Sequence, residues 1–159
     1  MTDISQRSPT PRLPPTWATV DDAWIDYNGH LSEGYYVLLF SRAIDDMLTH
    51  VGLGEPYRAA TNCAVFTVEA HVRYLHQVRA DSTIEIRNRI TAVDGKRLHS
   101  VHDMYVGEKL CATEEVVGLH VNREQERVVP FPAAVQTELA GYRQHGHTGP
   151  ISATVGATQ

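Results

Sequence analysis

The sequence contains no apolar run long enough to cross a lipid bilayer. Cysteine is scarce: Cys63 and Cys111 are the only two and form no CxxC pair, so we expect buried free thiols in a reducing compartment. An excess of basic residues is also absent. The net charge is −5 at pH 7, which argues against a nucleic-acid partner. We therefore expect a soluble, cytoplasmic protein that binds neither membranes nor nucleic acids.

Motifs for metal, nucleotide and serine-hydrolase chemistry are absent as well. The nine histidines form no HExxH, and His99/His102 and His145/His147 have no partners at the spacing of metal ligands. There is no G-x-S-x-G turn for a nucleophilic serine, and no P-loop or G-x-G-x-x-G for a nucleotide. We therefore expect no metal site and no nucleotide cofactor.

Length and composition predict one globular domain. The 159 residues, 42% hydrophobic and 21% charged, suffice for an ordinary hydrophobic core. Residues 1–15 hold four prolines and no apolar segment, which predicts a flexible tail and not a secretory signal. Residues 144–159 are mostly small and polar and predict a second flexible tail. The folded domain is expected to cover residues 16–143.

One long amphipathic helix is predicted after residue 32. Apolar residues recur there at steps of three and four, which places them on one helical face: Tyr36, Phe40, Ala43, Ile44, Met47, Leu48 and Val51. Ser32 is the expected N-cap, with its hydroxyl accepting a hydrogen bond from an amide of the first turn. Gly52 is the expected end, because glycine adopts the left-handed conformation at low cost.

Strands surround this helix in the sequence. Residues 16–20 form a short candidate, and residues 52–62 are expected to be a loop marked by Gly54 and Pro56. Residues 65–74 alternate strictly, with Phe66, Val68, Ala70, Val72 and Tyr74 expected on one face. Residues 82–93 alternate in the same way.

The remaining strands are joined by tight turns. Asp94-Gly95 is a strong hairpin signal, and Gly107-Glu108 marks a second turn between strands 97–106 and 109–122. Gly118 is expected to mark a bulge or bend, and residues 132–142 to form a short helix. The pattern predicts an α+β domain in which a five-stranded, mostly antiparallel sheet wraps around the long helix.

A family resemblance lies in Asp26-Tyr27-Asn28-Gly29-His30 and the Tyr36 that follows on the helix. This D-x-x-G-H pattern resembles the entry motif of hotdog-fold acyl-CoA thioesterases of the 4-hydroxybenzoyl-CoA thioesterase type. Two asparagines of that motif are replaced here by Ser32 and Glu33. The wider run from Trp24 also resembles betainyl-CoA thioesterases of carnitine degradation. The resemblance covers roughly residues 17–122 and implies a single hotdog domain that works as a homodimer or a dimer of dimers.

The resemblance assigns the chemistry to Asp26. Thioester hydrolysis needs a carboxylate that attacks the acyl carbon or deprotonates water, and donors for the developing oxyanion. In the family the aspartate of the motif is this carboxylate, and the polarising amide lies at the first helical turn, here near Glu33 and Gly34. From local sequence alone, Asp26 fits better as a residue that caps a turn. The motif and the order of the elements together favour the catalytic role. Glu33 and Glu69 are secondary acidic candidates.

A substrate pocket is expected around this motif. Its candidate residues flank Asp26 or supply aromatic rings: Trp24, Tyr27, Asn28, His30, Tyr36 and Phe66. Aromatic faces and carboxylates attract a quaternary ammonium such as that of a betainyl group. Six basic residues of the middle strands could hold the phosphates of coenzyme A or simply form a solvated face: Arg73, Arg79, Arg87, Arg89, Lys96 and Arg97.

We therefore expect a thioesterase for a small acyl-CoA, preferably betainyl-CoA, with coenzyme A present only as part of the substrate. The alternatives are a thioesterase for an aromatic or short-chain acyl-CoA or for an acyl-carrier protein, and a non-catalytic hotdog module that binds acyl-CoA. A hotdog dehydratase is disfavoured, because the His-centred motif of those families is missing.

Overall fold

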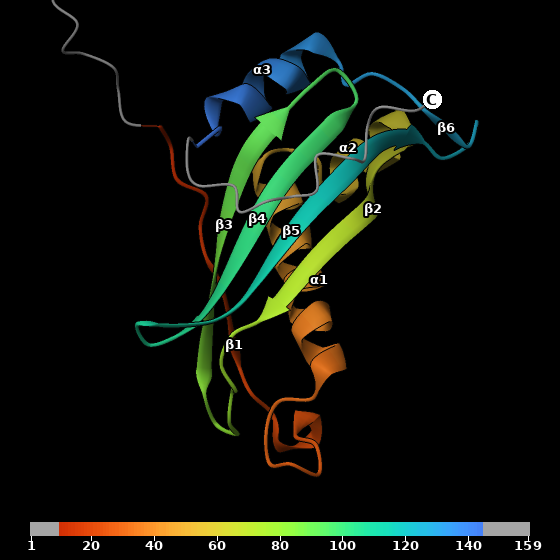
Figure 1. The fold of residues 1–159 in the computed structure, drawn as a ribbon. Helices are drawn as coiled ribbons and strands as arrows, with labels where there is room; N and C mark the ends of the chain where they lie inside the picture. Colours follow the sequence, from red (N-terminus) through yellow and green to blue (C-terminus); the bar gives the residue numbers. More distant parts are fainter. Residues whose placement is uncertain (1–9, 145–159) are drawn as a thin grey trace, which may run out of the picture.

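The computed structural model describes residues 10–144, which form a curled antiparallel sheet around one long helix (Figure 1). The helix α1 runs over Glu33–His50. The sheet has the order β1-β3-β4-β5-β2, and β6 pairs with β5. Its strands are β1 Thr16–Thr19, β2 Cys63–Tyr74, β3 Thr83–Val93, β4 Arg97–Val106, β5 Lys109–Asn122 and β6 Arg127–Val128. The predicted α+β architecture is confirmed, and β6 adds a short sixth strand.

Helix α1 begins and ends where the sequence predicted. Gly52 has φ = 82°, and the Gly52 and Leu53 amides donate to the Thr49 and Leu48 carbonyls. These two bonds form a Schellman motif, which satisfies carbonyls left free at the helix end. At the other end Ser32 is the N-cap, as predicted, but its side chain makes no capping hydrogen bond. The prediction that the Ser32 hydroxyl accepts from a first-turn amide is therefore wrong. Among residues 10–144, no side chain therefore caps the amides of the first turn.

The loop expected at residues 52–62 contains a helix, which corrects that prediction. Helix α2 covers Glu55–Thr61, with Pro56 in its first turn. Proline fits this position because its missing N–H is not needed there and its φ is already helical. Helix α3, Ala133–Gly141, agrees with the short helix expected near the carboxyl end. A 3-10 turn, η1, covers Asp22–Trp24 just before the motif.

A bulge in β2 overturns the predicted face of that strand. The pairing of β2 with β5 shifts between Thr67 and Glu69. Before the bulge Val65 and Thr67 line a small cavity against α1, whereas after it Val72 packs into the core. The side chains that face α1 thus have odd residue numbers before the bulge and even numbers after it. Phe66 and Val68 stay exposed, at 47% and 52%. The bulge therefore reverses which side chains of the second half of β2 face α1.

Gly118 lies opposite this bulge, so the predicted irregularity exists but sits in the neighbouring strand. Gly118 pairs with Thr67, the last residue before the register shift. A Cβ at Gly118 would approach Val65 Cγ1 at 2.6 Å, too close for a real contact. Glycine therefore leaves the space that the Val65 side chain occupies at this point of the sheet.

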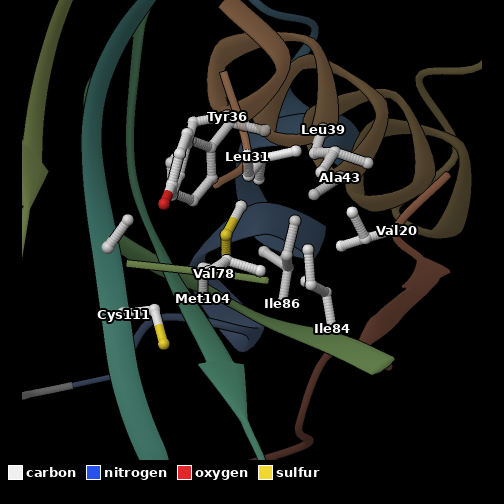
Figure 2. Packing of buried hydrophobic residues seen from close by; sticks show 12 residues of the cluster. Val20, Leu31, Tyr36, Leu39, Ala43, Val78, Ile84, Ile86, Met104 and Cys111 are labelled. Carbon is white, nitrogen blue, oxygen red and sulfur yellow. The ribbon is translucent and has the colours of Figure 1, made fainter. Parts of the chain in front are cut away.

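Two apolar clusters fill the space between α1 and the sheet. The first, shown in Figure 2, packs the amino-terminal half of α1 against β3, β4 and β5. In this view Tyr36 points from α1 toward β5. The second cluster joins the carboxyl-terminal half of α1 to α3 and includes Leu13, so contacts of the domain begin before residue 16. Cys63 and Cys111 are buried free thiols, as expected.

Buried polar side chains cross the sheet beneath α1. The Asn88 side-chain amide donates to the Pro14 carbonyl at 3.2 Å. The Asn88 Oδ1 therefore faces His102 Nδ1, 2.8 Å away, and this nitrogen carries the proton. His102 Nε2 must then accept from the Ser100 hydroxyl at 2.9 Å. Burial, helped by the charge of Arg89, lowers the pKa of His102 to about 3, which keeps the ring neutral.

Residues 1–9 and 145–159 lie outside the described part, and the two tail predictions fall mostly there. Within residues 10–144 no helix combines the length and apolarity needed to span a membrane.

Candidate active site

Asp26 sits in a tight turn immediately before α1. Its Oδ1 accepts a hydrogen bond from the Asn28 amide at 2.8 Å, and its carbonyl accepts from the Gly29 amide at 3.0 Å. Gly29 has φ = 79°, a left-handed conformation that glycine adopts without strain. The Asp26 amide in turn donates to the His30 carbonyl at 2.9 Å. The turn therefore holds the carboxylate in place through Oδ1 and leaves Oδ2 without a hydrogen-bond partner among the described residues.

The turn is anchored to the rest of the fold on both sides. The Ser32 amide donates to the Trp24 carbonyl, and Ile25 and Leu31 form an isolated β-bridge. The Leu31 amide donates to the Val78 carbonyl at 2.8 Å, which ties the turn to the loop after β2. Leu31 itself is buried in the first core cluster. The carboxylate is thus carried by a short loop fixed at both ends.

The amino terminus of α1 follows directly. Tyr35 donates its amide to the Ser32 carbonyl at 3.0 Å, whereas the Glu33 and Gly34 amides precede the first helical hydrogen bonds. A Cβ added at Gly34 would meet nothing within 4 Å, so the space beside it is open. Aligned peptide dipoles give this helix end a partial positive charge that favours an anion.

A pocket of about 790 Å³ opens between the turn, α1 and the end of β2. It is lined by Asp26, Asn28, His30, Leu31, Glu33, Tyr36, Tyr74, Leu75, His76 and Gln77. Two of these residues carry carboxylates, and among the described residues that line the pocket there is no arginine or lysine. Tyr36 from α1 and Tyr74 from β2 form a T-shaped pair with ring centroids 5.2 Å apart, which joins the two sides of the pocket. The pocket is therefore acidic and aromatic.

Five of the predicted site residues meet in this pocket, namely Asp26, Asn28, His30, Glu33 and Tyr36. Gly34 lies next to it on the first turn of α1.

The other predicted residues lie elsewhere. Trp24 stacks on Tyr35 at 5.4 Å with the Arg42 guanidinium 5.8 Å from its ring, and Tyr27 is 98% exposed. Phe66 is exposed on β2 and does not line the pocket of the single chain, and Glu69 follows the bulge.

The sequence did not predict the far wall of the pocket. Leu75, His76 and Gln77 come from the loop after β2, where the Leu75 and His76 amides both donate to the Cys111 carbonyl at 2.9 Å. Tyr74 was recognised only as one of several aromatic residues. A histidine and a glutamine directly after a strand carry no motif of their own, so only the folded chain places them opposite Asp26.

The basic residues of the middle strands divide into two groups. Arg87 pairs with Glu85, Arg89 with Asp103 and Arg97 with Asp94, at 2.6 to 2.9 Å. Arg87 also stacks over the Tyr105 ring at 4.0 Å. Arg73, Arg79 and Lys96 make no ion pair with the described residues. The paired arginines are thus partly neutralised already, which favours the others as partners for phosphate.

Comparison with known proteins now identifies the family. A family model for the thioesterase-like superfamily matches residues 20–139. The chain belongs to the thioesterase-like superfamily. The matched span includes the Asp26 turn, α1 and the whole pocket wall after β2.

Named relatives lie within the same superfamily. A betainyl-CoA thioesterase of Pseudomonas aeruginosa is 35% identical over 136 residues, 84% of this chain and 85% of that protein. An L-carnitine dehydrogenase/betainyl-CoA thioesterase of Agrobacterium fabrum is 38% identical over 77% of this chain, which spans only 25% of that longer protein. A Staphylococcus aureus protein solved in complex with CoA superposes with a TM-score of 0.83 at 26% identity, covering 92% of this chain and 94% of that one. The hotdog fold expected from the sequence is confirmed.

Proposed function

We propose that this protein is an acyl-CoA thioesterase whose preferred substrate is betainyl-CoA, which it hydrolyses to betaine and CoA. The observation that carries the proposal is the pocket that joins the Asp26 carboxylate to the amino terminus of α1. Membership of the thioesterase-like superfamily and 35% identity to a betainyl-CoA thioesterase support the reaction. The acidic and aromatic lining of the pocket supports a cationic acyl group.

The proposed chemistry divides the work between a side chain and the backbone. Asp26 Oδ2, the oxygen left free by the turn, removes a proton from water or attacks the acyl carbon itself. The Glu33 and Gly34 amides donate hydrogen bonds to the thioester oxygen as it gains negative charge. Collapse of the tetrahedral intermediate expels the CoA thiolate. The missing side-chain cap at Ser32 supports this assignment, because the hydroxyl does not compete for the first-turn amides.

The test is thiol release from betainyl-, acetyl-, benzoyl- and 4-hydroxybenzoyl-CoA. Loss of a general base costs roughly 10²- to 10⁴-fold in rate, so we expect Asp26→Asn to lower kcat by at least about a hundredfold. Asp45→Asn is the matched control, because Asp45 is an exposed aspartate on α1 outside the pocket. Release confined to another acyl group would discard betainyl-CoA and keep the mechanism. No release from any thioester, or an unimpaired Asp26→Asn, would reject the proposal.

Single-turnover hydrolysis in ¹⁸O-labelled water separates the two roles of Asp26. Direct attack forms an acyl–Asp26 anhydride, and water that cleaves it at the Asp26 carbonyl leaves label in the protein. Base catalysis places the label in the released acid alone. Mass spectrometry of the peptide that contains Asp26 gives the answer, and an unlabelled peptide rejects this anhydride route.

We further propose that the protein forms a homodimer through β2. This strand lies at the edge of the sheet formed by residues 10–144, so one row of its backbone groups has no strand partner there and can pair with a second strand. Two of its apolar side chains are half exposed, as are two on the neighbouring α1: Phe66 and Val68 on β2, and Val37 and Leu38 on α1. A second copy would cover both groups.

Light scattering after size-exclusion chromatography tests the dimer. Val68→Lys places a charge on the edge strand and is expected to yield monomers. Val128→Lys on β6 is the control, because this valine is also exposed. A dimer that survives Val68→Lys would place the interface elsewhere.

A further inference from the structure

A buried carboxyl group that the proposed mechanism does not use lies beside the pocket. Glu114 on β5 is only 3% exposed, and its Oε2 has no hydrogen-bond partner within the described part of the chain. Burial raises the pKa of Glu114 to about 7. An unpaired carboxyl group in a core is costly, and each such group in a folded protein calls for an explanation.

The strand register places Glu114 on the inner face of the sheet, under α1. It pairs with His102 of β4 on one side and with Val72 of β2 on the other. Both neighbours point inward, since His102 belongs to the buried polar row and Val72 packs against the first core cluster. Side chains directly opposite one another on neighbouring strands share a face.

Tyr74 connects Glu114 to the pocket. Along the same inner face, the next pair of β2 and β5 residues is Tyr74 with Ala112. Burial raises the pKa of the Tyr74 phenol, and the charges of Glu33 and Glu114 raise it further. Glu33 lines the pocket. The Tyr74 ring is therefore within electrostatic reach of a carboxylate in the pocket and of the buried carboxyl group of Glu114.

We propose that Glu114 is the specificity-determining counter-charge for the quaternary ammonium of the acyl group. The ammonium lies against the rings of Tyr36 and Tyr74, and Glu114 attracts it from the inner side of that aromatic wall. Quaternary ammonium groups cannot donate hydrogen bonds, so aromatic faces together with a nearby carboxylate suit them well. In a site with a low dielectric the attraction acts over several ångströms without direct contact. The proposal rests on the thioesterase function and narrows its substrate class to cationic acyl groups.

The charge of the acyl group has an isosteric control. In 3,3-dimethylbutyryl-CoA a carbon atom replaces the nitrogen of betainyl-CoA, so the two thioesters share shape and differ in charge. Binding is measured by calorimetry in an Asp26→Asn background, which prevents turnover and separates binding from catalysis. The same measurement is repeated with Glu114→Gln added, and with Glu114→Asp, which keeps the acid.

We expect Asp26→Asn to bind betainyl-CoA at least about tenfold more tightly than its neutral isostere, a ratio that corresponds to 1.4 kcal/mol. Adding Glu114→Gln should reduce the preference at least about threefold by weakening betainyl-CoA alone, because the aromatic rings and Glu33 remain, and Glu114→Asp should restore part of it. Equal weakening of both ligands would mean a structural or general binding role and would overturn the proposal. A preference that is unchanged in Glu114→Gln, or none in Asp26→Asn, would also overturn the proposal.

The proposed hydrolysis is tested separately on the wild-type protein. Thiol release from either thioester leaves the thioesterase function standing when the binding preference fails. Absence of turnover with an intact, Glu114-dependent preference would instead reject hydrolysis and keep the cation site. The two proposals therefore fail in different experiments.

Discussion

Replacing Glu114 by glutamine should change how the stability of the free protein depends on pH. The carboxyl group titrates at a pKa of about 7 in the fold, against an ordinary value of 4.5. Because the folded pKa is raised, this group's contribution to stability is complete below pH 4.5 and is lost as the pH rises toward 7. Glutamine has the shape of the protonated acid and does not titrate, so Glu114→Gln should escape this loss.

The size of the effect follows from the linkage between pKa and stability. One pKa unit corresponds to about 1.4 kcal/mol, so the ionised carboxylate destabilises the fold by at most about 3 kcal/mol. Screening by water near the edge strand β2 reduces this to about 2 kcal/mol. For a domain of this size 1 kcal/mol changes Tm by roughly 2–4 °C. The variant should therefore melt about 4–8 °C above wild type at pH 8 and within a few degrees of it at pH 4.5.

Thermal unfolding followed by circular dichroism between pH 4.5 and 8 provides the measurement. Glu124→Gln is the control, since Glu124 is exposed in the turn after β5 and its replacement should leave the pH dependence unchanged. His102 loses stability as the pH falls from 6.5 toward 3, but it does so equally in both proteins and cancels in the difference. A Tm difference that stays constant from pH 4.5 to 8 would refute a raised Glu114 pKa.

Three other substitutions test the fold and the site. Gly118→Ala should lower stability by about 1–3 kcal/mol in urea unfolding, because its Cβ would lie 2.6 Å from Val65 Cγ1; an unchanged midpoint would contradict this close approach. Tyr57→Phe removes the 2.9 Å hydrogen bond to buried His120 Nε2 and should cost about 1–3 kcal/mol in the same assay. Glu33→Gln should lower kcat by less than about fivefold, since only its backbone amide is assigned to the oxyanion and its charge contributes about 1 kcal/mol at the helix end. A loss of a hundredfold would assign the role of the catalytic carboxylate, base or nucleophile, to Glu33.

The elements that local sequence determines were predicted well. Helix α1 shows its apolar stripe and its glycine end within one stretch of sequence, and the Asp94-Gly95 hairpin is likewise local. Helix α2 was missed because glycine and proline at its start were interpreted as a loop, although proline belongs in a first turn. The β2 bulge was not predicted, because one extra residue moves the following side chains to the other face of the sheet. The alternation of apolar and polar residues in the sequence continues unchanged through it.

The site divides in the same way. Asp26, His30 and Tyr36 are close in sequence, so one motif and one helical turn predict their grouping. The opposite wall, from Tyr74 to Gln77, approaches only through the pairing of β2 with β5 and the bond between Leu31 and Val78. Long-range pairing of this kind leaves no local sequence pattern. The sequence therefore predicts only the wall of the pocket that the Asp26 turn and α1 form.

The buried polar row provides an internal comparison for Glu114. A chain of hydrogen bonds starts at the Pro14 carbonyl and runs through Asn88, His102 and Ser100. Each bond determines which atom donates in the next. Such a network stabilises a unique core arrangement. Glu114 is the next residue across the sheet, yet its Oε2 takes no part in this chain. Because an apolar side chain or an amide would cost the fold less at neutral pH, packing does not explain this carboxyl group, and its position beside the pocket offers a functional reason.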